Sequence, residues 1–289
     1  MERFTDRDYQ AVCDFLVELN QAGTAHLNWN WARWEWMYSH PYCDRSLLPT
    51  MGLWKEKDSV VGAAIFDLYH GEAFCAALPE YKKFLPEIYS YAWENLRDEN
   101  GLGIAAADTD ADTRALLTEL GYQKAAQTEV MYCLDLKKPL EYMLPEDFSI
   151  RQIHFPEDTI AYKKVIYLGF DHAGDQAEWD NMLQSKAPLP PHLEPRLCLA
   201  VEDDKGEFAA HCTCWYDERT DYAYIEPVCT VPAHRGQGLG RGVVSEALNR
   251  CAAMGAKRAI VLSDQGFYKK LGFAPLENYT FYWKKGAAT

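Results

Sequence analysis

The stretch Glu226-Pro-Val-Cys-Thr-Val-Pro-Ala-His-Arg-Gly-Gln-Gly-Leu-Gly240 joins two patterns in this 289-residue sequence. An apolar segment from Tyr224 to Val231 is typical of a buried strand, and Pro232 ends it because proline has no backbone N–H to donate. Beyond the glycines, apolar residues recur at helical spacing from Val243 to Cys251. The glycines therefore lie where a strand gives way to the N-terminus of a helix.

Such a junction suits a phosphate group. The first turn of a helix carries backbone N–H groups without intrahelical partners, and the helix dipole adds positive potential there. Gly236, Gly238 and Gly240 would let a phosphate approach the main chain, while Arg235 and Arg241 add positive charge. We expect a diphosphate held mainly by main-chain groups; a glycine-rich turn without a ligand is the alternative.

Two common phosphate loops do not fit this stretch. A nucleotide P-loop would end in Gly-Lys-Ser/Thr, and a dinucleotide fingerprint would read Gly-x-Gly-x-x-Gly. Arg235-Gly-Gln-Gly-Leu-Gly240 instead resembles the acyl-coenzyme A loop of the GNAT superfamily of N-acetyltransferases. Downstream, Phe267-Tyr-Lys-Lys-Leu-Gly-Phe273 resembles the late motif of that family, in which the tyrosine points at the sulfur of the coenzyme.

The resemblance implies an α+β fold in which a mixed, mostly antiparallel sheet is flanked by helices. It implies acetyl-CoA as co-substrate, no metal, and a pantetheine arm bonded to the main chain of one strand like an additional strand. The expected coenzyme-binding residues are Val228, Cys229, Thr230, Arg235, Gly236, Gln237, Gly238, Leu239, Gly240, Arg241, Ser263 and Tyr268.

In this family the amine attacks the thioester directly, so the protein must polarise a carbonyl, accept a proton and protonate a thiolate. Tyr268 is the candidate acid, because the pKa of a phenol, about 10, lies near that of a thiol, about 8.5; a packed aromatic residue is the alternative. Glu226 is the candidate base, since it precedes the pantetheine segment; an ordinary salt-bridged acid is the alternative. Asp67, Asp217 and Glu218 are weaker candidates.

Three further residue patterns bear on the site. His234 lies on the phosphate side and is interpreted as structural, whereas His211, within a strand, is more typical of a satisfied core histidine than of a base. The family often places an asparagine after the fifth strand. Here that loop is short, Ser263 to Gly266, which leaves one coenzyme contact open.

The two halves of the chain form a distant internal repeat. Leu120-Gly-Tyr matches Leu271-Gly-Phe, an offset of 151, and Pro79-Glu-Tyr-Lys matches Pro232-Ala-His-Arg, an offset of 153. At these offsets the first half has lost the phosphate-binding glycines and the tyrosine. The opposed pairs are Leu85 with Gly238, Glu87 with Gly240 and Leu117 with Tyr268.

We therefore expect two tandem GNAT-like domains. The segment 1–140 is a degenerate domain that shapes or covers the site, and 146–289 is the domain that binds acyl-CoA, with a polar linker over 137–147 between them. In the first segment, Leu27, Trp31, Trp34 and Tyr38 form a stripe at helical spacing. This stripe predicts either a substrate-binding aromatic wall or, more commonly, a helix packed on a core.

Composition limits the function classes. The formal net charge of −14 disfavours nucleic acid and anionic membranes as partners and favours a cationic substrate. No apolar run has the length of a membrane span, the N-terminus does not read as a secretory signal, and nine scattered cysteines indicate a reduced, cytoplasmic protein. The sequence predicts an acyl-CoA-dependent N-acyltransferase acting on a small-molecule or peptide amine. A non-catalytic acyl-CoA-binding or regulatory protein is the alternative.

Overall fold

The computed structural model describes residues 1–21, 23–185 and 187–286. The chain divides into two compact units, which are described separately. Unit 1 comprises Met1–Tyr132, Leu262–Lys269 and Ala274–Thr289, and unit 2 comprises Cys133–Val261 and Lys270–Phe273. Within the described ranges, no helix has the length and apolar character needed to cross a bilayer.

Unit 1 is built on a sheet with the strand order β1-β2-β3-β4-β5-β12-β6. Of the pairings between neighbours from β1 to β12, only that of β4 with β5 is parallel. Its elements are β1 (Glu2–Arg3), α1 (Tyr9–Gln21), α2 (Trp31–Tyr38), β2 (Gly52–Glu56), β3 (Ser59–Asp67), β4 (Tyr69–Ala77), α3 (Leu85–Asn95), β5 (Leu102–Ala107), α4 (Ala111–Glu119), β6 (Gln123–Asp135) and β12 (Ala274–Lys284), with 3₁₀ turns at Asp6–Asp8, Leu48–Thr50 and Pro79–Phe84.

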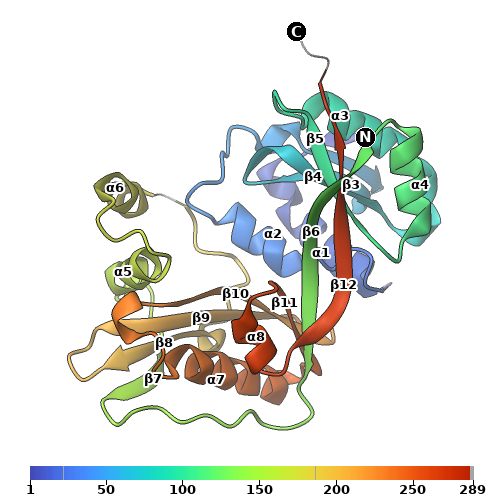
Figure 1. Ribbon diagram of the computed structural model, residues 1–289. Helices are drawn as coiled ribbons and strands as arrows, with labels where there is room; N and C mark the ends of the chain where they lie inside the picture. Colours follow the sequence, from blue (N-terminus) through green and yellow to red (C-terminus); the bar gives the residue numbers. More distant parts are fainter. Residues whose placement is uncertain (22, 186, 287–289) are drawn as a thin grey trace. The chain divides into compact units, whose positions relative to one another are not determined.

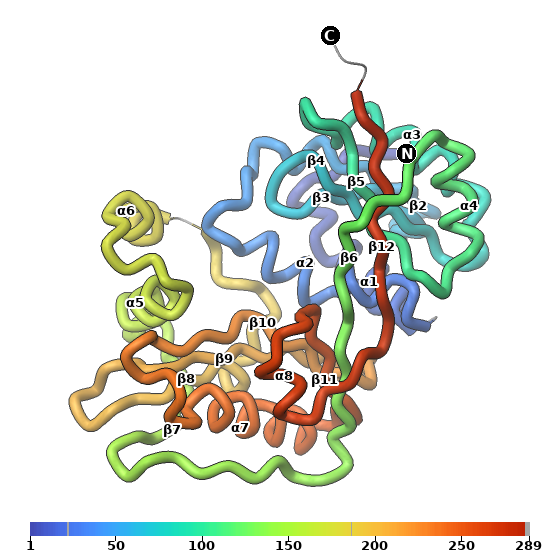
Figure 2. The backbone as a smooth tube through the Cα atoms, in the orientation of Figure 1, coloured from blue at the N-terminus to red at the C-terminus, as the bar shows by residue number. Residues whose placement is uncertain are grey.

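The last strand of the chain lies in the sheet of unit 1. β12 runs antiparallel to β5, with Tyr279 opposite Ala107 and Lys284 opposite Leu102 (Figure 2). Gly103 makes room for this strand, because a Cβ atom there would lie 2.7 Å from the Trp283 ring. The last strand of the chain therefore belongs to unit 1. The division at 1–140 and 146–289 stays a prediction about the two repeated sequences.

The aromatic stripe of unit 1 is buried. Asn30 caps α2 by accepting hydrogen bonds from the N–H groups of Ala32 and Arg33, and Trp34, on that helix, is fully buried. The Trp34 ring packs edge-on against Phe4 with 5.5 Å between ring centroids. The interpretation of the stripe as packed on a core is confirmed for Trp31, Trp34 and Tyr38. Leu27 is also buried, but it lies in the turn before α2 and not on the helix.

Unit 2 has the strand order β11-β10-β9-β8-β7. Only β10 and β11 pair in parallel; the other neighbours are antiparallel. Both units thus contain a mixed, mostly antiparallel sheet flanked by helices, and the predicted fold class is confirmed. The elements are β7 (Phe148–Gln152), α5 (Thr159–Gly169), α6 (Gln176–Gln184), β8 (Cys198–Asp203), β9 (Phe208–Tyr216), β10 (Tyr222–Thr230), α7 (Leu239–Met254) and β11 (Arg258–Leu262), followed by α8 (Gly266–Lys270); 3₁₀ turns cover Pro195–Leu197 and Pro232–His234.

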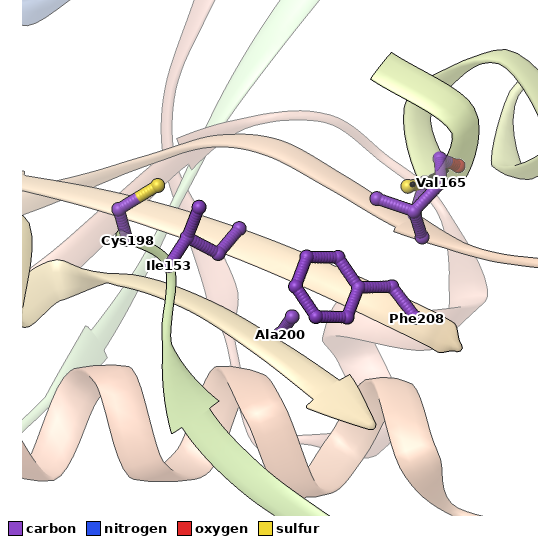
Figure 3. Packing of buried hydrophobic residues seen from close by; sticks show 6 residues of the cluster. Ile153, Val165, Cys198, Ala200 and Phe208 are labelled. Carbon is purple, nitrogen blue, oxygen red and sulfur yellow. Dashed lines mark hydrogen bonds between the residues drawn. The ribbon is translucent and has the colours of Figure 1, made fainter. Parts of the chain in front are cut away.

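Helices cover both faces of the unit 2 sheet, with α5 on one face and α7 on the other (Figure 1). Under α5, Val165 packs with Ile153, Cys198, Ala200 and Phe208 in one apolar cluster (Figure 3). The sequence did not predict helix α6, because the segment carries little apolar periodicity; Met182 is the one buried residue of this helix.

The predicted linker between the repeated sequences has no helix or strand over 137–147, but side chains of α7 hold it. Asn249 donates to the carbonyl of Leu140 at 3.0 Å and accepts from its N–H at 2.8 Å. The Tyr142 hydroxyl donates to Glu246 at 2.9 Å. The segment therefore follows a fixed course along α7 (Figure 2).

Candidate functional site

The candidate site begins at an irregularity in β10. Ile225 pairs with Cys214 and Val228 with Cys212 on β9, so Glu226 and Pro227 together face a single residue of β9. This is a β-bulge, which bends a strand and increases its local twist. The indole N–H of Trp215 donates to the carbonyl of Glu226 at 2.6 Å and holds the bulge on the β9 side.

Beyond the bulge, β10 separates from its parallel neighbour. Among the described residues, the pairing of β10 with β11 ends at Tyr224 and Ile260, whereas β10 continues to Thr230 with β9 as its partner. The other edge of this segment carries main-chain N–H and C=O groups that another extended chain could pair with. A pantetheine arm, which contains two amides, has the chemistry to do so.

The glycine loop follows this open edge. Gly236 and Gly238 adopt φ of +81° and +85°, a left-handed conformation that residues with a Cβ atom adopt at a cost. A Cβ atom on Gly236 would meet no atom within 4 Å, and one on Gly238 would meet only the Met143 carbonyl, at 3.9 Å. The protein therefore leaves space over the loop that a diphosphate can occupy.

The helix after the loop offers main-chain donors. Gly238 is the N-cap residue of α7 and uses no side chain to cap it. The first intrahelical bond in this turn runs from the Gly242 N–H to the Gly238 carbonyl. The N–H groups of Leu239, Gly240 and Arg241 precede that bond, so they are available to an anion. Loop and helix fit the diphosphate predicted from the sequence.

Arg235 has an additional task in the structure. Its guanidinium donates to the carbonyls of Thr230 at 3.0 Å and Gly169 at 2.9 Å, and it pairs with Asp171 at 2.9 Å. It thereby ties the loop to the end of α5. Arg241, in contrast, is exposed in the first turn of α7. The predicted diphosphate contacts of both arginines stay predictions.

Glu226 shares a hydrogen bond with a residue that sequence reasoning missed. The Tyr224 hydroxyl donates to Glu226 Oε2 at 2.7 Å, and Glu226 is half-buried. The signal was available in the sequence, because residues two apart on a strand share a face. The bond orients the carboxylate of the candidate base.

In the predicted pantetheine segment, the main chain and not the side chains is available to bind the coenzyme. The Cys229 thiol lies in the core under α5 and donates to the carbonyl of Val165 at 3.4 Å. Burial raises the pKa of Cys229 to about 12, so it is a thiol and not a thiolate at neutral pH. Val228 and Thr230 are half-buried on either side.

Two predicted residues belong to the other compact unit. Tyr268 lies on α8, is 7% exposed and stacks edge-on with Phe267. Ser263 follows β11, and its hydroxyl accepts from the N–H of Gln265 at 3.4 Å. Both residues fall in unit 1, and their roles toward the coenzyme stay predictions.

The remaining candidates have structural contacts. Arg219 donates two hydrogen bonds to Asp217, which lower the pKa of this carboxyl although burial acts in the opposite direction. Asp67 pairs with Arg33 at 2.8 Å. Glu218 lies exposed in the turn after β9.

Both histidines considered for the site are also packed. His234 packs edge-on against Phe148. His211 is fully buried, its Nδ1 lies 2.9 Å from the Leu199 carbonyl, and burial lowers its pKa to about 4. His211 is therefore a satisfied core histidine, as its sequence context indicated.

Comparison with known proteins supports the same family. The model of the acetyltransferase (GNAT) family matches residues 165–273. No curated protein is significantly similar in sequence.

Solved structures share the fold over the full chain at low identity. A tandem GNAT protein from the clavulanic acid biosynthesis pathway superposes with a TM-score of 0.64 at 14% identity, covering 100% of this chain and 98% of its own. A GCN5-related N-acetyltransferase from Sphaerobacter thermophilus gives 0.57 at 14% identity, with 98% and 94% covered. One from Kribbella flavida gives 0.53 at 16% identity, with 87% and 96% covered. Residues 165–273 thus match the acetyltransferase (GNAT) family, and over its length the chain shares the fold of a tandem GNAT protein.

Proposed function

We propose that the chain is an N-acyltransferase that moves an acetyl group from acetyl-CoA to an amine. The open edge of β10 that leads into the glycine loop and the first turn of α7 is the observation that carries the proposal. The strand edge offers amide partners for pantetheine, and the loop offers N–H groups for the diphosphate. When bound, acetyl-CoA supplies a thioester carbonyl that an amine can attack.

The residues of the strand favour direct transfer. The only cysteine on β10, Cys229, is buried with a pKa of about 12, so it does not offer a nucleophilic thiolate. Main-chain N–H groups near Val228 can donate to the oxygen of the reacting carbonyl. Attack by the amine itself therefore needs no acyl-enzyme.

Two side chains have proposed proton roles. Glu226, oriented by the Tyr224 hydroxyl, would accept a proton from the substrate ammonium directly or through water, which leaves a neutral amine free to attack the thioester. Tyr268 would donate a proton to the departing thiolate. The acidic composition, with a net charge of −14, supports a small-molecule or peptide amine that carries positive charge. All nine cysteines are free, which supports a reducing compartment such as the cytoplasm.

Thiol release from acetyl-CoA over a panel of small amines and peptide N-termini tests the proposal. We expect amine-dependent release of free CoA by the wild type. Glu226→Gln should lower kcat/KM by roughly 10²–10⁴-fold, because removal of a general base costs that much. Asp221→Asn is the matched control, since it removes a carboxylate of the same unit that pairs with Arg258 at 3.0 Å and is not a candidate base.

The outcomes separate the two function classes. Tight binding of acetyl-CoA without thiol release for any amine would favour the non-catalytic binding or regulatory protein. Thiol release that Glu226→Gln leaves unchanged would keep the transferase and remove Glu226 from its mechanism. Failure to bind acetyl-CoA at millimolar concentration would contradict both.

A further inference from the structure

Unit 1 contains a pocket of its own. It has a volume of about 580 Å³ and lies among the loop before α2, the start of α3 and the start of α4. A second, narrow cavity of about 20 Å³ shares five lining residues with it, His26 and Asp110 among them, and is lined further by β4 and β5. The volume of the larger pocket lies within the range of small-molecule sites in proteins, about 300–1,000 Å³.

The strand geometry explains the narrow cavity. Among the described residues, the parallel pairing of β4 with β5 ends at Ala73 and Ile104, whereas the strands continue to Ala77 and Ala107. The separated ends carry mainly alanine, including Ala76 and Ala106. Small side chains on diverging strands leave room that larger ones would fill.

A buried donor lines the narrow cavity without a partner. Trp29 is 3% exposed, and its indole N–H has no hydrogen-bond partner among the described residues. Its ring stacks on Phe74 at 3.9 Å between centroids, so its position is fixed. A buried unsatisfied donor costs about 1–3 kcal/mol, and an acceptor atom in the cavity would relieve this cost.

The mouth of the pocket carries charges of both signs around a histidine. Burial lowers the pKa of His26, which leaves it neutral at pH 7; Asp110 raises this pKa and Lys82 lowers it. Asp112, also in the lining, adds a second carboxylate. The pocket therefore presents an ammonium, carboxylates and a neutral imidazole, with apolar walls from Leu19, Leu85 and Leu116.

The pocket is poorly suited to a diphosphate. In place of the glycine loop, unit 1 has the segment Pro79–Phe84 as a 3₁₀ turn, and Pro86 removes one N–H from the first turn of α3. Glu87 places a carboxylate in that turn, where it accepts from the Trp54 indole at 3.0 Å. A ligand with one anionic and one cationic group suits the remaining charges better.

We propose that this pocket of unit 1 binds a small zwitterion of the amino-acid type. Its carboxylate would face Lys82, its ammonium would face Asp110 and Asp112, and its chain would extend toward Trp29. The site is a second binding site of the chain, because its lining includes none of the residues proposed to bind acyl-CoA, and it does not depend on transferase activity.

Binding of the twenty standard amino acids, tested singly on the full chain by ligand-observed NMR and titrated by calorimetry, tests this proposal. We expect at least one to bind, and to bind more tightly than n-butylamine or butyrate, which each carry one of the two charges. Lys82→Gln and Asp110→Asn should each weaken its binding about tenfold or more, the effect of losing one charged hydrogen bond. Asparagine is also a favourable N-cap, so Asp110→Asn keeps α4 intact.

Lys83→Gln is the matched control, because Lys83 is adjacent and exposed but does not line the pocket. It should leave amino-acid binding unchanged, and Lys82→Gln should leave acetyl-CoA binding and turnover unchanged. The proposal would be overturned if no amino acid bound at 10 mM, if n-butylamine or butyrate bound as tightly, or if acetyl-CoA competed with the bound amino acid.

Discussion

The two units contain the same parallel strand pair and use its divergence differently. In unit 2, β10 leaves β11 and leads into a loop with two left-handed glycines and a helix start free of side-chain caps. In unit 1, β4 leaves β5 and leads into a turn without glycine and a helix whose first turn holds Glu87. The parallel strands separate in both places, and a few side chains decide whether an anion can bind beyond them.

The largest expected effect concerns the tyrosine that the repeat replaces by Leu117 in unit 1. Tyr268→Phe should lower kcat by roughly 10²–10⁴-fold, because it removes the proposed proton donor to the thiolate. Acetyl-CoA affinity should stay within a few fold, since the ring remains. Single-turnover kinetics and calorimetry measure the two quantities; a loss of affinity with unchanged kcat would show that Tyr268 binds and does not donate.

A second substitution introduces into unit 2 the carboxylate that unit 1 carries in the first turn of α3. Gly240→Glu reproduces Glu87 at the position the repeat aligns with it, and should weaken acetyl-CoA binding by about 10²–10³-fold through repulsion and lost charged hydrogen bonds. A carboxylate in a first helical turn is favourable for the helix itself, so the fold should persist. Calorimetric titration with CoA and acetyl-CoA measures the effect.

Gly240→Gln is the isosteric control without charge. If both variants weaken binding equally, bulk and not charge excludes the diphosphate, and the contrast between the two clefts is steric. If neither does, the first turn of α7 does not hold the coenzyme.

Local patterns in the sequence predict the binding loop, but they do not predict which sheet the last strand joins. Gly236 and Gly238 are recognisable because a strand ends before them and a helix begins after them. The position of β12 depends on contacts such as that of Trp283 with Gly103, which lie far apart in the sequence. No spacing rule encodes such a contact.

In the candidate acyl-CoA site, too, contacts between neighbours in the sequence can be predicted and contacts between distant segments cannot. The bond between Tyr224 and Glu226 could be inferred from strand alternation, because the two residues are neighbours on one face. The contacts of Arg235 with Gly169 and Asp171 could not, since they join segments that the sequence does not place together. The charge of Arg235, expected to serve a phosphate, is partly used to anchor α5.

A third prediction concerns the strand that supports β10. His211 pairs with Cys229 in register, whereas Ala63 pairs with Ala76 at the aligned place in unit 1. Burial lowers the pKa of His211 to about 4, below its unfolded value of about 6.5, so protonation favours the unfolded state. The stabilising contribution is complete above pH 6.5 and is lost as the pH falls toward 4, by about 2 kcal/mol at pH 5.

Urea unfolding at pH 7.5 and pH 5 measures this loss. His211→Asn can keep the hydrogen bond to the Leu199 carbonyl but does not titrate, so its free energy of unfolding should fall less between the two pH values. Hydrogen exchange, corrected for intrinsic rates, should increase at pH 5 in β9 and β10 more than in β3 and β4. Equal increases would place the acid sensitivity elsewhere.

The smallest expected effect is on the packing behind the open strand of unit 2. A Cβ atom on Gly169 would lie 2.5 Å from the Cys229 sulfur, so Gly169→Ala should force α5 away from β10 and cost about 1–3 kcal/mol in the free energy of unfolding. Gly242→Ala is the control. Its Cβ would be too close only to the flexible end of Leu144, at 2.6 Å, and would make an ordinary contact with Tyr142 at 3.5 Å; alanine also favours a helix, so the net effect should be near zero. Because Arg235 donates to the Gly169 carbonyl, movement of α5 should also weaken acetyl-CoA binding by a few fold. If Gly242→Ala changed the affinity for acetyl-CoA and Gly169→Ala did not, the glycine loop would be supported by α7 alone and not by α5.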